Sequence, residues 1–176
     1  MQKNKCLFLD RDGVINVDIN RYITSIYEIQ FYPPIFEIAY WAKQKDYKIV
    51  VITNQAGISR GLQSYEEVEE VHLFIQKEFN KRNLKIDKFY YCPHHPDFSK
   101  CFCRKPGTLN FEKAIAEFDI NPLHSIMLGD NIRDILPAKK LGIPTILIHP
   151  LLQPTCATFQ LEKLEDTLPL LRQVFL

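Results

Sequence analysis

Short apolar segments recur along this chain, and several of them run directly into carboxylate, hydroxyl or amide side chains. Five segments have the composition of buried strands, at 5–9, 48–52, 88–91, 125–128 and 145–148. Apolar residues recur at helical spacing between them, which predicts helices over about 35–42, 65–79, 108–118, 134–141 and 161–172. Strands that alternate with helices favour right-handed crossovers and a parallel sheet. We therefore expect an α/β fold, a doubly wound, Rossmann-like and mostly parallel sheet of about five strands with helices on both faces.

Two local signals set helix boundaries. Ser64, followed three residues later by Glu67, has the pattern of a capping box at a helix start. Gly142, Ile143 and Pro144 form a sequence at which a helix is expected to stop.

Length and charge limit the classes of protein to consider. The 176 residues suit a single domain over 1–176. A formal net charge of +1 provides no overall field that would attract a nucleic acid. No apolar stretch approaches the roughly 20 residues of a membrane span, and the apolar run before Asp10 is too short for a signal peptide. We expect a cytoplasmic monomer that binds neither nucleic acid nor membrane.

Polar side chains follow three of the predicted strands. Asp10 and Asp12 follow the first, Thr53, Asn54 and Gln55 the second, and Asp130 the fourth. The carboxyl ends of parallel strands meet at one edge of the sheet, where ligands bind. Two carboxylates so close repel each other, and Mg²⁺ offsets that repulsion where a substrate phosphate completes its shell. With Lys105 as a mobile positive charge from a later loop, this set is suited to phosphoryl transfer. Taken alone, an Asp after a strand is more often a turn residue or a helix N-cap, and we expect Asp134 to be such a cap.

Four soft metal ligands lie in one short segment. Of the five cysteines, Cys92, Cys101 and Cys103 cluster with His94, whereas Cys6 and Cys156 stand apart as expected packing residues. Residues two apart in an extended chain share a side, so each pair can present two ligands to one point. Three thiolates and one imidazole complete a tetrahedral Zn²⁺ site, which is then structural. The alternative is that these are small buried or surface residues, and His95 is an alternative ligand to His94.

Four segments resemble a known superfamily. FLDRDGVIN (8–16), ITNQAG (52–57), CRKP (103–106) and MLGDNIRD (127–134) are similar, in order, to the signature segments of haloacid dehalogenase superfamily phosphatases. The resemblance implies that Asp10 is the nucleophile and Asp12 the general acid and base. It also implies that Thr53 holds the transferring phosphoryl group, that Lys105 steadies it, and that Asp10, the Asp12 backbone carbonyl and Asp130 bind Mg²⁺.

Further segments resemble one family within this superfamily. DRDGVIN, NQAGISRG, CPHHP and the segment 92–103 are most similar to D-glycero-D-manno-heptose-1,7-bisphosphate 7-phosphatases, which act in nucleotide-activated heptose synthesis for lipopolysaccharide. Histidinol-phosphate phosphatases share the zinc segment and remain an alternative, as does a catalytically dead, zinc-stabilised scaffold. No cap domain fits between the signature segments, so the loops at about 17–32, 55–64 and 93–104 are expected to bound an open site. We expect Asn54 and Gln55 to contact substrate, and Arg60 and Arg104 to bind a second phosphate.

Overall fold

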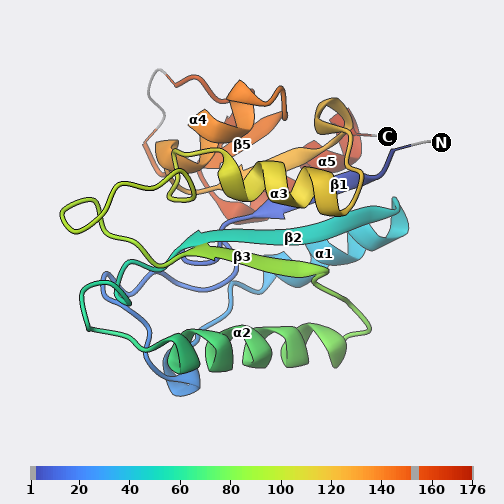
Figure 1. Cartoon of the computed structure of the whole chain (residues 1–176). Coiled ribbons are helices and arrows are strands. Elements are labelled where there is room, and N and C mark those ends of the chain that lie inside the picture. The colour runs from blue at the N-terminus through green and yellow to red at the C-terminus, as the bar shows by residue number, and fades with distance from the viewer. Residues whose placement is uncertain (1–2, 152–154, 176) are drawn as a thin grey trace.

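The computed structural model describes residues 3–151 and 155–175 and confirms the expected α/β class (Figure 1). The strands are β1 (Lys5–Leu9), β2 (Tyr47–Asn54), β3 (Lys88–Cys92), β4 (Ile126–Gly129), β5 (Thr145–Ile148) and β6 (Phe159–Leu161). The helices are α1 (Pro34–Gln44), α2 (Tyr65–Asn80), α3 (Leu109–Glu117), α4 (Ile132–Lys140) and α5 (Thr167–Val174). Three short 3₁₀ turns are η1 (Ile26–Glu28), η2 (Pro122–His124) and η3 (Leu164–Asp166).

The strands form one parallel sheet in the order β3-β2-β1-β4-β5-β6. The five predicted strands are all present, and β6 is a sixth that the sequence pattern did not indicate. The predicted helix over 161–172 is wrong at its start, because Phe159 to Leu161 pair with β5 and α5 begins only at Thr167. Three residues are too few to show the alternation by which a strand is recognised.

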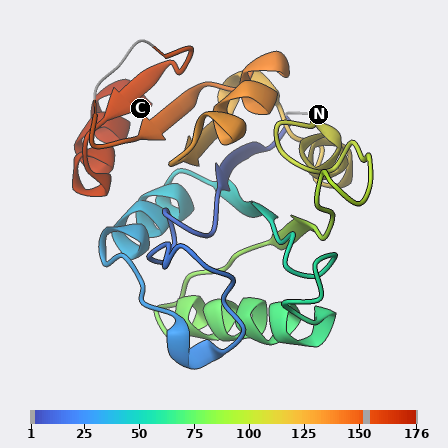
Figure 2. The same ribbon diagram turned by 90° about the vertical axis from the view of Figure 1, so that its left-hand side faces the viewer.

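Side chains of the central strands point alternately into two cores. Leu7, Leu9 and Val51 belong to the core beneath α1, α2 and α5, whereas Phe8 and Val50 belong to the core beneath α3 and α4. Figure 2 shows these two groups of helices on opposite faces of the sheet. Because the central strands are buried on both faces, their sequences are continuously apolar.

The carboxyl ends of the strands share one edge of the sheet. The loops that follow β1, β2 and β3 gather on the left of Figure 1, and both ends of the chain lie on the right. The polar residues predicted at the strand ends are therefore brought to a common edge. No helix within the described residues has the length and apolar character needed to cross a membrane.

Both predicted helix boundaries are confirmed. The Glu67 backbone amide donates to the Ser64 hydroxyl at 3.0 Å, and the Ser64 amide donates to the Glu67 carboxylate at 2.7 Å. Gly142, with φ of +77°, lies two residues beyond the end of α4 in the left-handed region that glycine tolerates.

Candidate active site and metal centre

Asp10 and Lys105 form a buried ion pair at the carboxyl end of β1. Lys105 Nζ lies 2.8 Å from Asp10 Oδ1 and donates to the Ile52 carbonyl at 2.6 Å. The Arg11 backbone amide donates to the same Oδ1 at 2.7 Å, which fixes the carboxylate. Lys105 is only 2% exposed, so the expectation of a mobile charge is wrong. Its side chain is held because burial leaves the ammonium no solvent to replace these oxygens.

Three carboxylates gather here, and two of them contact that lysine. Oxygens of Asp10, Asp130 and Asp134 lie within 4.8 Å of one another, and Lys105 Nζ is 2.7 Å from Asp134 Oδ1. Asp134 also accepts from the Asn131 amide at 3.0 Å in the capping box of α4. The prediction that Asp134 caps the helix start is therefore wrong, because α4 begins at Ile132 and Asn131 is its N-cap. Asp134 lies in the first turn of α4, where one oxygen closes the capping box and the other belongs to the site.

The crowding of these acids changes their ionisation. Burial and the neighbouring Asp134 raise the pKa of Asp10, although Lys105 opposes the change. Burial and Asp134 also raise the pKa of Asp130 to about 6. One lysine thus leaves negative charge uncompensated, which is the electrostatic condition that a cation relieves.

Gly13 keeps the backbone close to Asp130. Its φ is +86°, and a Cβ atom at this position would lie 2.1 Å from Asp130 Oδ2. Asp130 Oδ1 is buried and has no hydrogen-bond partner among the described residues. A carboxylate oxygen in this state is suited to an additional ligand.

Asp12 points to a different set of partners. Arg11 donates from Nη2 to Asp12 Oδ2 at 2.9 Å, and Asn16 Nδ2 donates to Oδ1 at 2.9 Å. Gln55 Nε2 donates to Asp12 Oδ2 at 3.1 Å and to the Thr53 hydroxyl at 2.9 Å. Burial of Asp12 opposes its ionisation, but the charge of Arg11 and these hydrogen bonds outweigh burial and lower its pKa.

Asn54 is joined to the backbone of Lys105 at both ends of its amide. Its Nδ2 donates to the Lys105 carbonyl at 3.1 Å, and its Oδ1 accepts from the Lys105 amide at 3.0 Å. Asn54 therefore fixes the position of the lysine. It also lines the pocket described next, so its contact with substrate stays a prediction.

A pocket of about 310 Å³ opens beside Asp12. Five arginines and two aspartates are among its lining residues, which are Arg11, Asp12, Asp18, Asn20, Arg21, Tyr22, Ile23, Asn54, Gln55, Ala56, Arg60, Arg104 and Arg133. Arg11 is paired with Asp12 and Arg21 with Glu28. Arg60 donates to the Tyr22 hydroxyl at 3.4 Å, and Arg104 to the His94 carbonyl at 3.2 Å. Although these arginines have partners, the lining holds more positive than negative side chains, so the pocket is suited to an anion.

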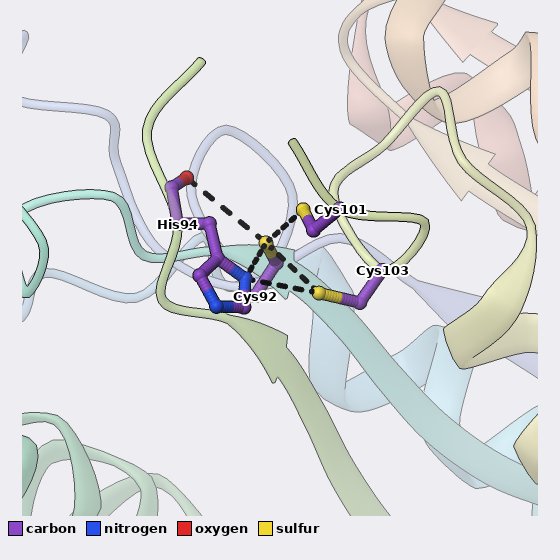
Figure 3. A group of neighbouring side chains, drawn as sticks. All are labelled: Cys92, His94, Cys101 and Cys103. Atoms are coloured by element: carbon purple, nitrogen blue, oxygen red, sulfur yellow. Dashed lines mark hydrogen bonds between the residues drawn. The ribbon is translucent and has the colours of Figure 1, made fainter. Parts of the chain in front are cut away.

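The four soft ligands converge in the Cys/His loop, residues 92–103 (Figure 3). Cys92 Sγ lies 3.6 Å from Cys101 Sγ and 3.2 Å from Cys103 Sγ, and His94 Nδ1 lies 3.3 Å from Cys103 Sγ. A tetrahedron with metal bonds of about 2.0–2.3 Å has edges of roughly 3.3–3.8 Å. His95 lies outside the group and approaches Asp97 at 3.4 Å, in agreement with the choice of His94.

Comparisons with known proteins agree with this geometry. Residues 102–150 match a family model described as HAD-hyrolase-like. A Campylobacter jejuni protein named D-glycero-alpha-D-manno-heptose-1,7-bisphosphate 7-phosphatase is 39% identical over 83% of this chain and 83% of its own length. A Chlorobaculum tepidum protein, named D-glycero-D-manno-heptose-1,7-bisphosphate 7-phosphatase, is 36% identical over 85% of this chain and 80% of its own length. This chain belongs to the heptose-1,7-bisphosphate 7-phosphatase family.

Solved structures place this family member among haloacid dehalogenase-like phosphatases. The D,D-heptose 1,7-bisphosphate phosphatase of B. bronchiseptica, complexed with magnesium and phosphate, superposes with a TM-score of 0.84 at 27% identity, covering 96% of this chain and 98% of the other. The structure of a putative HAD-like phosphatase of Mesorhizobium loti superposes with a TM-score of 0.85 at 25% identity, covering 98% of this chain and 87% of the other.

Two residues of this family member were missed from the sequence. Asp134 was taken only as a cap, although it contacts Lys105. Arg133 lines the pocket, and its buried Nε has no hydrogen-bond partner among the described residues. A basic residue in the first turn of a helix is unfavourable, and that signal could have identified Arg133.

Proposed function

We propose that this chain is a Mg²⁺-dependent phosphatase that removes the 7-phosphate of D-glycero-D-manno-heptose 1,7-bisphosphate. The observation that carries the proposal is the meeting of Asp10, Asp130 and Lys105 at one edge of the sheet, in a chain 39% identical to a protein of that name. The names of the relatives favour this substrate over histidinol phosphate. We further propose that the product enters nucleotide-activated heptose synthesis and that the reaction takes place in the cytoplasm.

Mg²⁺ fits the residues present. Asp10 and Asp130 supply hard carboxylate oxygens, and the Asp12 backbone carbonyl is the third proposed ligand. The unpartnered Asp130 Oδ1 and the excess of negative charge both support a cation here. When bound, the ion offsets the negative charge of the carboxylates and the phosphate.

Phosphate transfer takes two displacements in this proposal. An oxygen of Asp10 attacks phosphorus while the bond to the sugar oxygen breaks. Although burial opposes the change, Arg11 lowers the pKa of Asp12 in the free protein, so Asp12 takes up a solvent proton when the negative phosphate binds beside it, and then gives that proton to the sugar oxygen. Water then attacks the aspartyl phosphate, Asp12 takes the water proton, and the bond between phosphorus and Asp10 breaks. Thr53 holds a phosphoryl oxygen during both steps. The three hydrogens of the Lys105 ammonium go to Asp10, Asp134 and the Ile52 carbonyl, so Lys105 steadies the nucleophile directly and the phosphate through its positive charge.

Zn²⁺ is the proposed occupant of the Cys/His loop. Three sulfurs and one imidazole nitrogen within 4.8 Å of one another match its preferred donors. With four protein ligands the ion has no open position, so its role is to hold the loop that carries Arg104.

The first test compares substrates with purified wild-type protein. We expect Mg²⁺-dependent phosphate release with kcat/KM at least about tenfold higher for the heptose bisphosphate than for histidinol phosphate, because the pocket arginines have a second phosphate to bind. Chelation should stop release, and added Mg²⁺ should restore it. A higher kcat/KM for histidinol phosphate would reject the heptose bisphosphate as the substrate. The absence of phosphate release from any phosphorylated metabolite would favour the catalytically dead scaffold.

Arg104 provides a second test. Arg104→Ala should raise KM about tenfold for the bisphosphate and change it much less for the heptose 7-phosphate, because a charged hydrogen bond to the second phosphate is lost. Steady-state kinetics on both substrates measure the difference. Arg172→Ala, on α5 and outside this pocket, is the matched control. Equal losses on both substrates would mean that Arg104 serves the Cys/His loop through the His94 carbonyl instead.

A further inference from the structure

A buried histidine that the proposed chemistry does not use lies on α2. His72 is 3% exposed, and its neighbours on the same helix face are apolar. Its ring stacks on Phe89 with centroids 4.6 Å apart and planes at 16°, and the Tyr91 ring lies at 5.4 Å. An apolar side chain would fill this space without burying a polar ring.

The polar partner of His72 is Arg11. The Arg11 side chain is also buried, at 1% exposure, and its Nη1 lies 3.5 Å from His72 Nε2. A guanidinium can only donate, so Nε2 must be the acceptor and the ring hydrogen must be on Nδ1. Nδ1 has no hydrogen-bond partner among the described residues. Burial, together with the charge of Arg11, lowers the pKa of His72 to about 3, which keeps the ring neutral.

The other nitrogens of Arg11 hold Asp12. Nε and Nη2 each donate to Asp12 Oδ1 at 3.1 Å, and Nη2 donates to Oδ2 at 2.9 Å. Asn16 adds a third donor to Oδ1. Oδ1 therefore accepts three hydrogen bonds, whereas Oδ2 accepts two, from Arg11 Nη2 and from Gln55 Nε2. Oδ2 is the oxygen with fewer donors to displace when it carries the proton.

We propose that His72 and Arg11 are positioning residues that orient Asp12 for proton transfer to the leaving oxygen, which rests on the acid role of Asp12 in the proposed function. His72 provides the only side-chain acceptor recorded for Arg11 Nη1 among the described residues. Without it, a buried donor is unpaired, and the guanidinium shifts toward other oxygens and tilts the carboxyl group. Proton transfer depends steeply on such alignment.

The test uses two substrates that differ in their need for a proton. A sugar alkoxide must be protonated as it leaves, whereas p-nitrophenolate leaves without a proton. Because kcat/KM reports the steps up to release of the alcohol, only the sugar phosphate should respond to the position of Asp12. His72→Leu should lower kcat/KM for the heptose bisphosphate about tenfold and for p-nitrophenyl phosphate less than about twofold. Since Asp12 acts in the transition state, kcat should carry most of the loss.

Two further variants separate positioning from packing. His72→Gln keeps an acceptor for Arg11. It should therefore bring the ratio of kcat/KM for the heptose bisphosphate to kcat/KM for p-nitrophenyl phosphate most of the way back to the wild-type value. Phe89→Leu removes the stacked ring but leaves the acceptor, so it should lower thermal stability and keep the wild-type ratio of the two kcat/KM values. Arg11→Met should change the ratio in the same direction as His72→Leu, and further.

The outcomes are distinct from those of the proposed function. Wild-type activity on the heptose bisphosphate decides the proposed substrate, and any alkyl phosphate that the wild type hydrolyses can then replace it in the comparison. Equal losses on the alkyl and aryl phosphates in His72→Leu, or no loss on either, would overturn the positioning role.

Discussion

Asp10→Asn is expected to lower phosphate release by about 10⁴-fold or more, because an amide oxygen is not a nucleophile toward phosphorus. The fold should survive the change. The asparagine carbonyl can accept the two hydrogen bonds that Oδ1 receives from the Arg11 amide and Lys105. The asparagine is also neutral, so it removes the repulsion between Asp10 and the carboxylates of Asp134 and Asp130, which in the wild type acts with burial to raise the pKa of Asp10.

Phosphate release and thermal unfolding, measured on the same preparation, check this result. Asp46→Asn is the matched control, since Asp46 lies between α1 and β2 at the opposite end of the sheet. Its φ is 58°, a conformation that asparagine tolerates. The control should keep wild-type activity. A rate near that of the wild type in Asp10→Asn would remove Asp10 as nucleophile.

Cys101→Ser is expected to lower bound zinc and the unfolding temperature together, because a serine hydroxyl is a poor ligand for Zn²⁺. A loss of about 2–3 kcal/mol would lower the unfolding midpoint by roughly 4–12 °C in a chain of this size. The rate of phosphate release should change less than the unfolding temperature. The reason is that Lys105 is held by Asp10 and Asp134 in the protein core and not by the Cys/His loop.

Elemental analysis of the purified protein and a thermal melt give the two values. Cys156→Ser is the control, because Cys156 lies outside the group of four ligands and should leave the zinc content unchanged. Full zinc content in Cys101→Ser, or loss of zinc without loss of stability, would contradict a structural zinc site.

The order of strands and helices could be predicted because each central strand is continuously apolar and each helix has a regular stripe. β6 could not, because Phe159 to Leu161 gain their conformation from pairing with β5 and not from a local pattern. His72 carried a signal that was not used. It is a polar residue within the apolar stripe of Val68, Val71 and Ile75, where a buried hydrogen bond is to be expected.

The candidate site residues could be located from strand ends and motifs, but their mutual contacts could not. Lys105 follows the Cys/His loop in the sequence, and only the three-dimensional path of its side chain brings it between Asp10 and Asp134. The two contacts of Asp134 likewise depend on packing of α4 against the sheet. The monomeric state and the absence of nucleic-acid or membrane partners stay predictions.

Cys103, Arg104 and Lys105 are consecutive, and the two outer residues are anchored independently. Cys103 belongs to the cluster of sulfurs, and Asn54 holds the backbone of Lys105. Residues 95–100 lie outside both anchors. We expect insertions or deletions there to alter how far the loop reaches toward a bound sugar while leaving the lysine in place. Relatives can thus diverge in substrate range through the length of this segment while hydrolysis itself is inherited unchanged.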